Sequence, residues 1–238
     1  MNISHFIALY KEAFTDKINL PIAIWYSKES KANTEPINGC FVKVLHRVLA
    51  GECISLNPLN IKCNGGKLYT EFGQMSPHTP KFVAEKEHYK KSPEFVEAYV
   101  ESLELMIRED EYLHICRLDL LDSFDDVEAL LFLVSPDVLS GLTTWAYFDN
   151  NNFDAVSAPF GSGCCTTITH VIKENKRNGN RTFVGLFDPS VRQYFNSNLL
   201  SYAIPMSRFR IMYETMKKSC LFGTHAWNKI KQRIEIEA

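Results

Sequence analysis

Residues 159–167, Pro159-Phe160-Gly161-Ser162-Gly163-Cys164-Cys165-Thr166-Thr167, crowd glycines, thiols and hydroxyls between two regular elements. Residues 153–158 before them have the pattern of a short half-buried strand, and Ile168, Val171 and Ile172 after them have helical spacing. The glycines permit positive φ and close backbone approach, and the free amides at the start of a helix attract anions. A strand, a tight turn and a helix in this order predict a ligand site of the kind found in α/β sheets.

Strands and helices alternate along the rest of the chain. Hydrophobic periodicity and capping signals predict helices at 3–15, 39–50 and 168–178, others that begin at 92, 136, 189 and 205, and a last one after 223. They predict strands at 21–26, 52–57, 112–120, 127–135, 153–158, 181–187 and 199–204. Residues 72–91 lack a period and are expected to be a long surface connection of the kind that forms lids. The alternation predicts an α/β fold, a mixed sheet with flanking helices, in one compact unit over residues 1–238.

Two similar strand-helix-strand halves, 1–110 and 111–238, are a further expectation. The first half has a strand at 22–26, the helix at 39–50, a strand at 52–57 and the turn at Cys63. The second half has the same order, with a strand at 127–135, the helix from Pro136, a strand at 153–158 and the turn at Cys164. Residue identity between the halves is slight, so the chance recurrence of a common unit is an equal alternative.

Composition excludes several classes of partner. The net charge is −2, charged residues make up 23% of the chain, and Lys and Arg are scattered. This favours neither nucleic acid nor an anionic membrane as a partner. The chain has no stretch with the length of a membrane span, and its first residues are too polar for a signal peptide. We therefore expect a cytoplasmic protein whose seven cysteines are all reduced.

The first functional hypothesis is the binding of a small anionic ligand or cofactor in a cleft lined by glycine and cysteine. The candidate residues are Gly161, Ser162, Gly163, Cys164, Cys165 and Thr166, with Cys40 and Cys63 from the first half. Amides at the helix start and the hydroxyls would hold a phosphate or carboxylate. The turn lacks the lysine of a phosphate-binding P-loop and the Gly-x-Gly-x-x-Gly pattern, so a tight turn with capping hydroxyls is the alternative. No motif identifies a cofactor.

The second hypothesis is a thiol-based or metal site, with zinc or an iron-sulfur cluster. Cys40, Cys63, Cys164 and Cys165 all lie at turns or helix starts, where thiolates are stabilised. Against it, the chain has no Cys-x-x-Cys pair, and a free cysteine is often only a small buried apolar residue. The third hypothesis is a non-catalytic structural or interaction protein.

Cys165, His170 and Asp188 are residue types that could form a catalytic triad like that of a hydrolase. Nothing in the spacing selects it, because such triads are recognised by geometry and not by sequence position. If the cysteines share a site, the sulfurs of Cys40, Cys63 and one of the pair Cys164 and Cys165 should surround one concavity between the halves within about 10 Å.

Several landmarks together resemble an uncharacterised prokaryotic family, domain of unknown function 169. They are Pro21-Ile22-Ala23-Ile24, the Cys40 helix, Cys63-Asn64-Gly65-Gly66, Phe132-Leu133-Val134-Ser135-Pro136, Gly161-Ser162-Gly163-Cys164-Cys165, Val184-Gly185-Leu186-Phe187 with Arg192, and Ala203-Ile204-Pro205. The resemblance covers nearly the whole chain. It implies a prokaryotic cytoplasmic setting and supports the glycine and cysteine positions, but it implies no activity.

Overall fold

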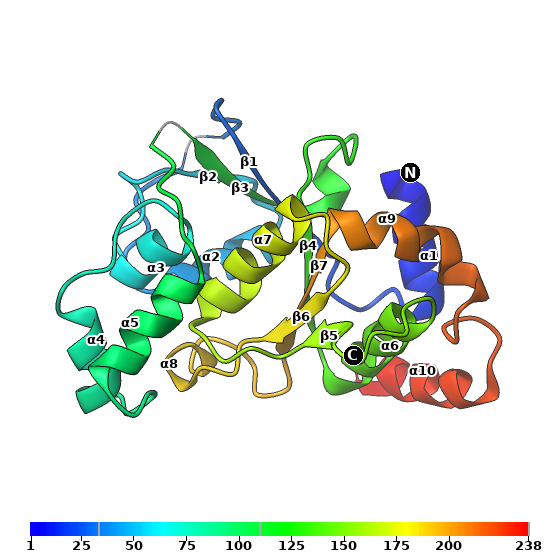
Figure 1. The fold of residues 1–238 in the computed structure, drawn as a ribbon. Helices are drawn as coiled ribbons and strands as arrows, with labels where there is room; N and C mark the ends of the chain where they lie inside the picture. Colours follow the sequence, from blue (N-terminus) through cyan, green and yellow to red (C-terminus); the bar gives the residue numbers. More distant parts are fainter. Residues whose placement is uncertain (33, 110, 238) are drawn as a thin grey trace.

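One mixed sheet organises the molecule. The computed structural model describes residues 1–32, 34–109 and 111–237. In these residues seven strands lie in the order β2-β3-β1-β4-β7-β6-β5 (Figure 1). Their bounds are β1 Ile22–Ser27, β2 Ile54–Leu56, β3 Tyr112–Arg117, β4 Ala129–Val134, β5 Val156–Ser157, β6 Thr182–Gly185 and β7 Leu200–Pro205. Among these seven strands of the described residues, only β5 and β6 pair in parallel. The predicted α/β fold, with a mixed sheet and flanking helices, is confirmed.

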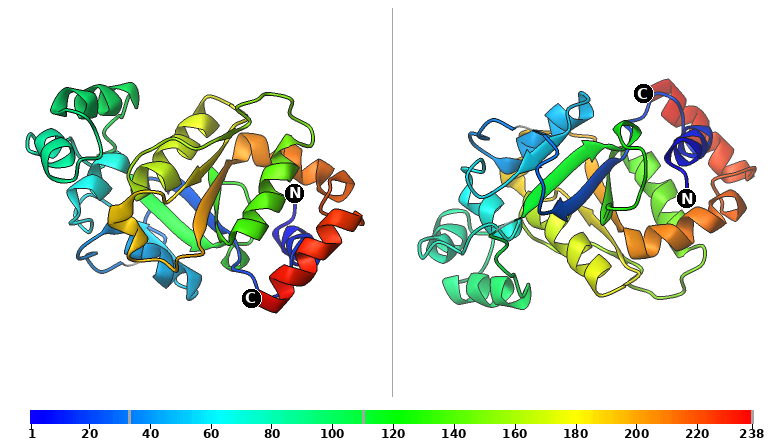
Figure 2. Two further views of the ribbon diagram at one scale, coloured as in Figure 1. Left: turned by 90° about the horizontal axis from the view of Figure 1, so that it is seen from below. Right: turned by 90° about the horizontal axis from the view of Figure 1, so that it is seen from above.

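Helices cover both faces of the sheet (Figure 2). One face packs against α2 (Val44–Leu49) and α7 (His170–Lys176). The other packs against α1 (Ile3–Ala13), α6 (Pro136–Tyr147), α9 (Met206–Thr215) and α10 (His225–Glu237). Four short helices lie at the end of the molecule away from α1 and α10 (Figure 1), namely α3 Asn64–Tyr69, α4 Thr79–Lys81, α5 Pro93–Ser102 and α8 Pro189–Arg192.

Strand residues alternate between two hydrophobic clusters because successive side chains of a strand point to opposite faces. Ala23 and Trp25 of β1 belong to the cluster under α1 and α6, whereas Ile22 and Ile24 belong to the cluster under α2 and α7. The sheet is therefore buried on both sides, and its central strands consist of nearly continuous apolar residues, as the sequence has them at 129–134.

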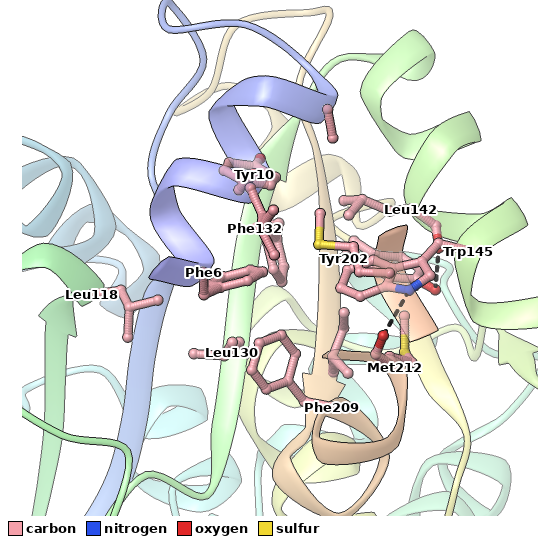
Figure 3. Packing of buried hydrophobic residues seen from close by; sticks show 14 of the residues in the cluster. Phe6, Tyr10, Leu118, Leu130, Phe132, Leu142, Trp145, Tyr202, Phe209 and Met212 are labelled. Carbon is pink, nitrogen blue, oxygen red and sulfur yellow. Dashed lines mark hydrogen bonds between the residues drawn. The ribbon is translucent and has the colours of Figure 1, made fainter. Parts of the chain in front are cut away.

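Aromatic side chains fill the first cluster (Figure 3). Phe6 of α1 meets Phe209 of α9 edge to face, with 4.8 Å between the ring centroids. The Trp145 indole of α6 donates a hydrogen bond of 3.0 Å to the carbonyl of Met212. A buried indole N–H usually needs such a partner, so this bond fixes how α6 and α9 pack.

The sheet contains one topological unit twice. β3 lies between β1 and β2 and is antiparallel to both, and β7 lies in the same way between β4 and β6. The helix before β2 is α2 and the helix before β6 is α7, and both pack on the same face. The pairing of the helix at 39–50 with the helix from Pro136 is wrong, because α2 and α6 pack on opposite faces. The equivalent segments are β1-α2-β2-β3 and β4-α7-β6-β7.

The sequence follows this new pairing. Gly39-Cys40 before α2 matches Gly163-Cys164 before α7, and the matches continue with Val44 and Ile168, His46 and His170, and Val48 and Ile172. In each unit the second strand, β2 or β6, is followed by an Asn-Pro or Asp-Pro pair whose first side chain caps the next turn. Asn57 Oδ1 accepts from Leu59 N at 2.9 Å, and Asp188 Oδ1 accepts from Ser190 N at 2.9 Å. The expected boundary at residue 110 lies outside the described residues, and the division into 1–110 and 111–238 stays a prediction.

The expectation of seven reduced cysteines is wrong for one pair. Cys53, just before β2, is bonded to Cys116 of β3, with 4.3 Å between their Cα atoms. The partners are 63 residues apart, so spacing alone gave no reason to pair them. The other five cysteines are free thiols.

Candidate functional site

A cavity of about 560 Å3 opens at the end of the molecule where the short helices gather. The two Gly-Cys turns of the repeated unit meet there, because Gly163 packs on Val42, the third residue after Gly39. Six of the eight predicted site residues line the cavity: Cys40, Cys63, Gly161, Ser162, Gly163 and Cys164. Three cysteines from distant parts of the chain therefore border one concave space.

Two helix starts form part of the wall. The helical segment that begins at Gly163 is capped by Ser162, whose Oγ accepts from Cys165 N at 3.3 Å. Its first intrahelical bond runs from Thr166 N to Ser162 O at 3.0 Å, so the amides of Gly163 and Cys164 precede the helical ladder. At α3, the Cys63 Sγ accepts from Gly66 N at 3.3 Å. The positive end of a helix dipole thus lies at the cavity.

Burial disfavours the thiolate form of two thiols that line the cavity, Cys40 and Cys164. Burial raises the pKa of Cys164 well above its usual range, and the neighbouring Cys63 and Cys40 add to the rise. The pKa of Cys40 is also raised, mainly by burial. Within residues 1–32, 34–109 and 111–237 no group of three or more His, Cys, Asp or Glu side chains has the spacing to hold a metal ion. The zinc and iron-sulfur hypothesis therefore gains no support from the arrangement of these cysteines.

Cys165 lies behind the wall. Its Sγ is 3.2 Å from the Tyr99 hydroxyl and 3.5 Å from His170 Nε2. Residues 165–169 form a π-helical turn, in which the amide of His170 bonds to the carbonyl of Cys165. The wider turn brings residues i and i+5 to one side of the helix, where an α-helix would separate them. Burial raises the pKa of Cys165 to about 11 and lowers that of His170 to about 4, so the pair is not a thiolate and imidazolium.

Thr166 also points away from the cavity. Its Oγ1 accepts from Leu186 N at 3.3 Å, and a Cβ on Gly185 would come within 2.5 Å of the Thr166 side chain. This residue joins the helix to β6, which explains the glycine in that strand. The structure thus joins Cys165 and His170 of the hydrolase-like set, but Asp188 bonds instead to Ser190.

Aromatic side chains form much of the remaining wall. They come mainly from the segment 69–99 and from the central turn, namely Tyr69, Phe82, Tyr89, Tyr99 and Phe160. The expected long connection at 72–91 contains α4 and a π-helical turn at Phe82–Lys86, and it borders the cavity. Lys90 Nζ lies 4.9 Å from the ring centroid of Tyr99 and 5.6 Å from that of Phe160. This cation-π contact joins the segment to the central turn.

Asp188, named in the sequence only as part of the hydrolase-like set, has a different place in the structure. Its side chain lines the cavity, yet the residue is only 4% exposed. Oδ1 accepts from Ser190 N at 2.9 Å and Oδ2 from Ser190 Oγ at 2.8 Å. Among the described residues no Lys, Arg or His forms an ion pair with it. The Asp-Pro pair predicted a helix start, and only the tertiary fold shows the carboxylate at the cavity.

Comparison with known proteins places the chain in a family. A search of curated proteins and of solved structures finds no match to it. Of the helices in the described residues, none combines the length and the apolar character that a membrane crossing requires. The model of the family DUF169, described as uncharacterised ArCR, matches residues 17–215, which contain all seven strands and the whole cavity wall. The chain therefore belongs to the DUF169 family.

Proposed function

We propose that this protein binds a small molecule in the cavity between its two Gly-Cys turns. The observation that carries the proposal is the cavity itself, about 560 Å3 in volume and lined from both repeated units. Pockets for small ligands typically measure about 300–1,000 Å3 and combine apolar walls with a few polar groups. The aromatic wall suits an apolar body, and the amides of Gly163 and Cys164 suit an anionic group.

Binding is better supported than thiol chemistry. A thiol-based function has one observation in its favour, since Cys40, Cys63 and Cys164 border the same space. The nucleophile is the thiolate, however, and burial raises the pKa of both Cys40 and Cys164. A purely structural protein gives no reason for such a large open space, because interiors are normally close-packed. The cytoplasmic setting is part of this proposal; the five free thiols favour it, whereas the Cys53–Cys116 bond is of a kind that is rare in reducing compartments.

The test uses a dye with an apolar body and one sulfonate, 1-anilinonaphthalene-8-sulfonate, titrated into the full chain by calorimetry. Val83 lines the cavity, so the substitution Val83→Trp fills part of it. Leu59 is 79% exposed and lies outside the cavity, so Leu59→Trp is a control that adds the same side chain to the surface.

The expected result is one binding site in the wild type and in Leu59→Trp. In Val83→Trp the Kd for the dye should be at least about tenfold higher. Equal binding by both variants would place the dye elsewhere and contradict the proposal. A circular dichroism melt of each variant shows whether it is folded.

A further inference from the structure

The wall of the cavity that holds the amides of Gly163 and Cys164 also holds a buried carboxylate, that of Asp188. A Cβ on Gly163 would come within 3.0 Å of Val191 Cγ1, so the central turn packs directly on α8. Asp188 is the N-cap of α8 and faces the same cavity. This carboxylate repels the anionic group of a ligand at short range, so a ligand that also carries a cation should bind more tightly than one with an anionic group alone.

No side chain in the described residues neutralises that charge. The acidic residues in the lining are Glu87 and Asp188, and the basic ones are His78 and Lys90. The Lys90 ammonium lies over the Tyr99 and Phe160 rings and forms no ion pair with Asp188. The negative charge reaches the neighbouring walls: burial raises the pKa of Tyr69 and of Cys40, and Asp188 adds to both rises.

A buried carboxylate without a cationic partner is costly unless something supplies one. Asp188 keeps lone pairs beyond the two that Ser190 uses, since an ionised carboxylate has about four acceptor positions. The nearby aromatic faces also attract cations, as the position of Lys90 shows. A ligand that carries a cation could supply this missing charge.

We propose that the ligand is a zwitterion of the α-amino-acid type with a large apolar side chain. Its carboxylate meets the amides of Gly163 and Cys164, its ammonium meets Asp188, and its side chain lies against the aromatic wall. One carbon separates the two charges of an α-amino acid, which fits an anion site and a cation site on directly packed segments. This inference rests on the proposed function and names the class of ligand for that cavity.

Three compounds with the same phenyl group separate the two charges. L-Phenylalanine carries both, 3-phenylpropionate only the carboxylate, and phenethylamine only the ammonium. Each is titrated by calorimetry into the wild-type chain and into Asp188→Asn, which keeps an acceptor oxygen for the Ser190 amide. Asp122 is exposed and outside the cavity, so Asp122→Asn is the matched control.

We expect L-phenylalanine to bind at least about tenfold more tightly than either analogue, and Asp188→Asn to remove that advantage without weakening 3-phenylpropionate. Asp122→Asn should behave as the wild type. The inference is overturned if 3-phenylpropionate binds as tightly as L-phenylalanine, or if Asp188→Asn leaves L-phenylalanine unaffected, or if none of the three compounds binds. In each of these cases the naphthalene sulfonate titration still decides separately whether the cavity binds small molecules.

Discussion

Gly141 lies where α6 touches α1 and α10. A Cβ there would come within 2.3 Å of the Trp227 ring and 2.9 Å of the Phe14 ring. Trp227 cannot retreat freely, because its indole donates to the Ala13 carbonyl at 2.8 Å. We expect Gly141→Ala to lower the free energy of unfolding by about 1–3 kcal/mol, as overpacking of a core does. Urea unfolding measures it.

Gly65 gives the matched control for this prediction. It is also helical, but the nearest atom to its added Cβ is the Cys63 Sγ at 4.0 Å, an ordinary contact. Gly65→Ala should be neutral or slightly stabilising, because alanine favours helix more than glycine does. Equal losses at the two sites would show that the backbone, and not the Trp227 contact, sets the cost.

His114 should make stability depend on pH. Its ring nitrogens each lie 2.8 Å from a serine hydroxyl, Ser27 at Nε2 and Ser55 at Nδ1. Burial, with a smaller contribution from Lys31, lowers its pKa from 6.5 to about 4. The unfolded chain therefore binds the proton first as the pH falls, so stability is complete above about 6.5 and declines toward 4.

The test compares unfolding free energies at pH 7 and pH 5. The wild type should lose roughly 2 kcal/mol more over this interval than His114→Asn, which has no titrating ring. His170, whose pKa is lowered in the same direction, leaves a residual dependence in the variant. The control is exposed His225→Asn, which should keep the full wild-type loss. An unchanged slope in His114→Asn would contradict the assignment.

At the scale of elements, the Cys53–Cys116 bond links the residue just before the edge strand β2 to the neighbouring strand β3. Ellman's reagent in denaturant without reductant should detect the five free thiols, and seven after reduction. Because the bond closes a separation of 63 residues, its reduction should cost about 2–4 kcal/mol of stability. Seven reactive thiols before reduction would restore the expectation of a fully reduced chain.

Helices and strands were predictable where packing and local pattern agree. The Ser-Pro-Asp start of α6 and the apolar run of β4 fall where the sequence places them. Helix α3 was missed because Gly65 and Gly66 disfavour helix. A Cβ on Gly66 would come within 2.9 Å of Phe41 Cβ, so tertiary packing demands that glycine. The predicted strand at 153–158 shrinks to Val156–Ser157, since Phe153 is 93% exposed.

At the scale of the whole molecule, alternation in the sequence predicted the α/β class but not the order of the strands. The wrong helix pairing shows why. Each of α2 and α6 is the first helix after a long strand, β1 or β4, and only the face of the sheet on which each packs shows that they are not equivalent. The cysteines and the Gly-Ser-Gly turn could be selected by residue type alone. The aromatic wall could not, and Asp188 could be named only for a triad that the fold does not form. Both reach the cavity through long-range packing of α8 and of the segment 69–99.

The π-helical turn at Cys165–Thr169 fixes the angle, about the helix axis, between the residues that line the cavity and the residues that pack in the core. One residue corresponds to about 100° of rotation in an α-helix. Removing a single residue from this turn would return the segment to α-helical winding. Ile168 and Ile172 could then stay in the core only if the start of the helix turned by about that angle and carried Gly163 and Cys164 away from Asp188. The juxtaposition of the proposed anion and cation sites thus depends on the length of the chain, counted to one residue, as well as on the residues that form them.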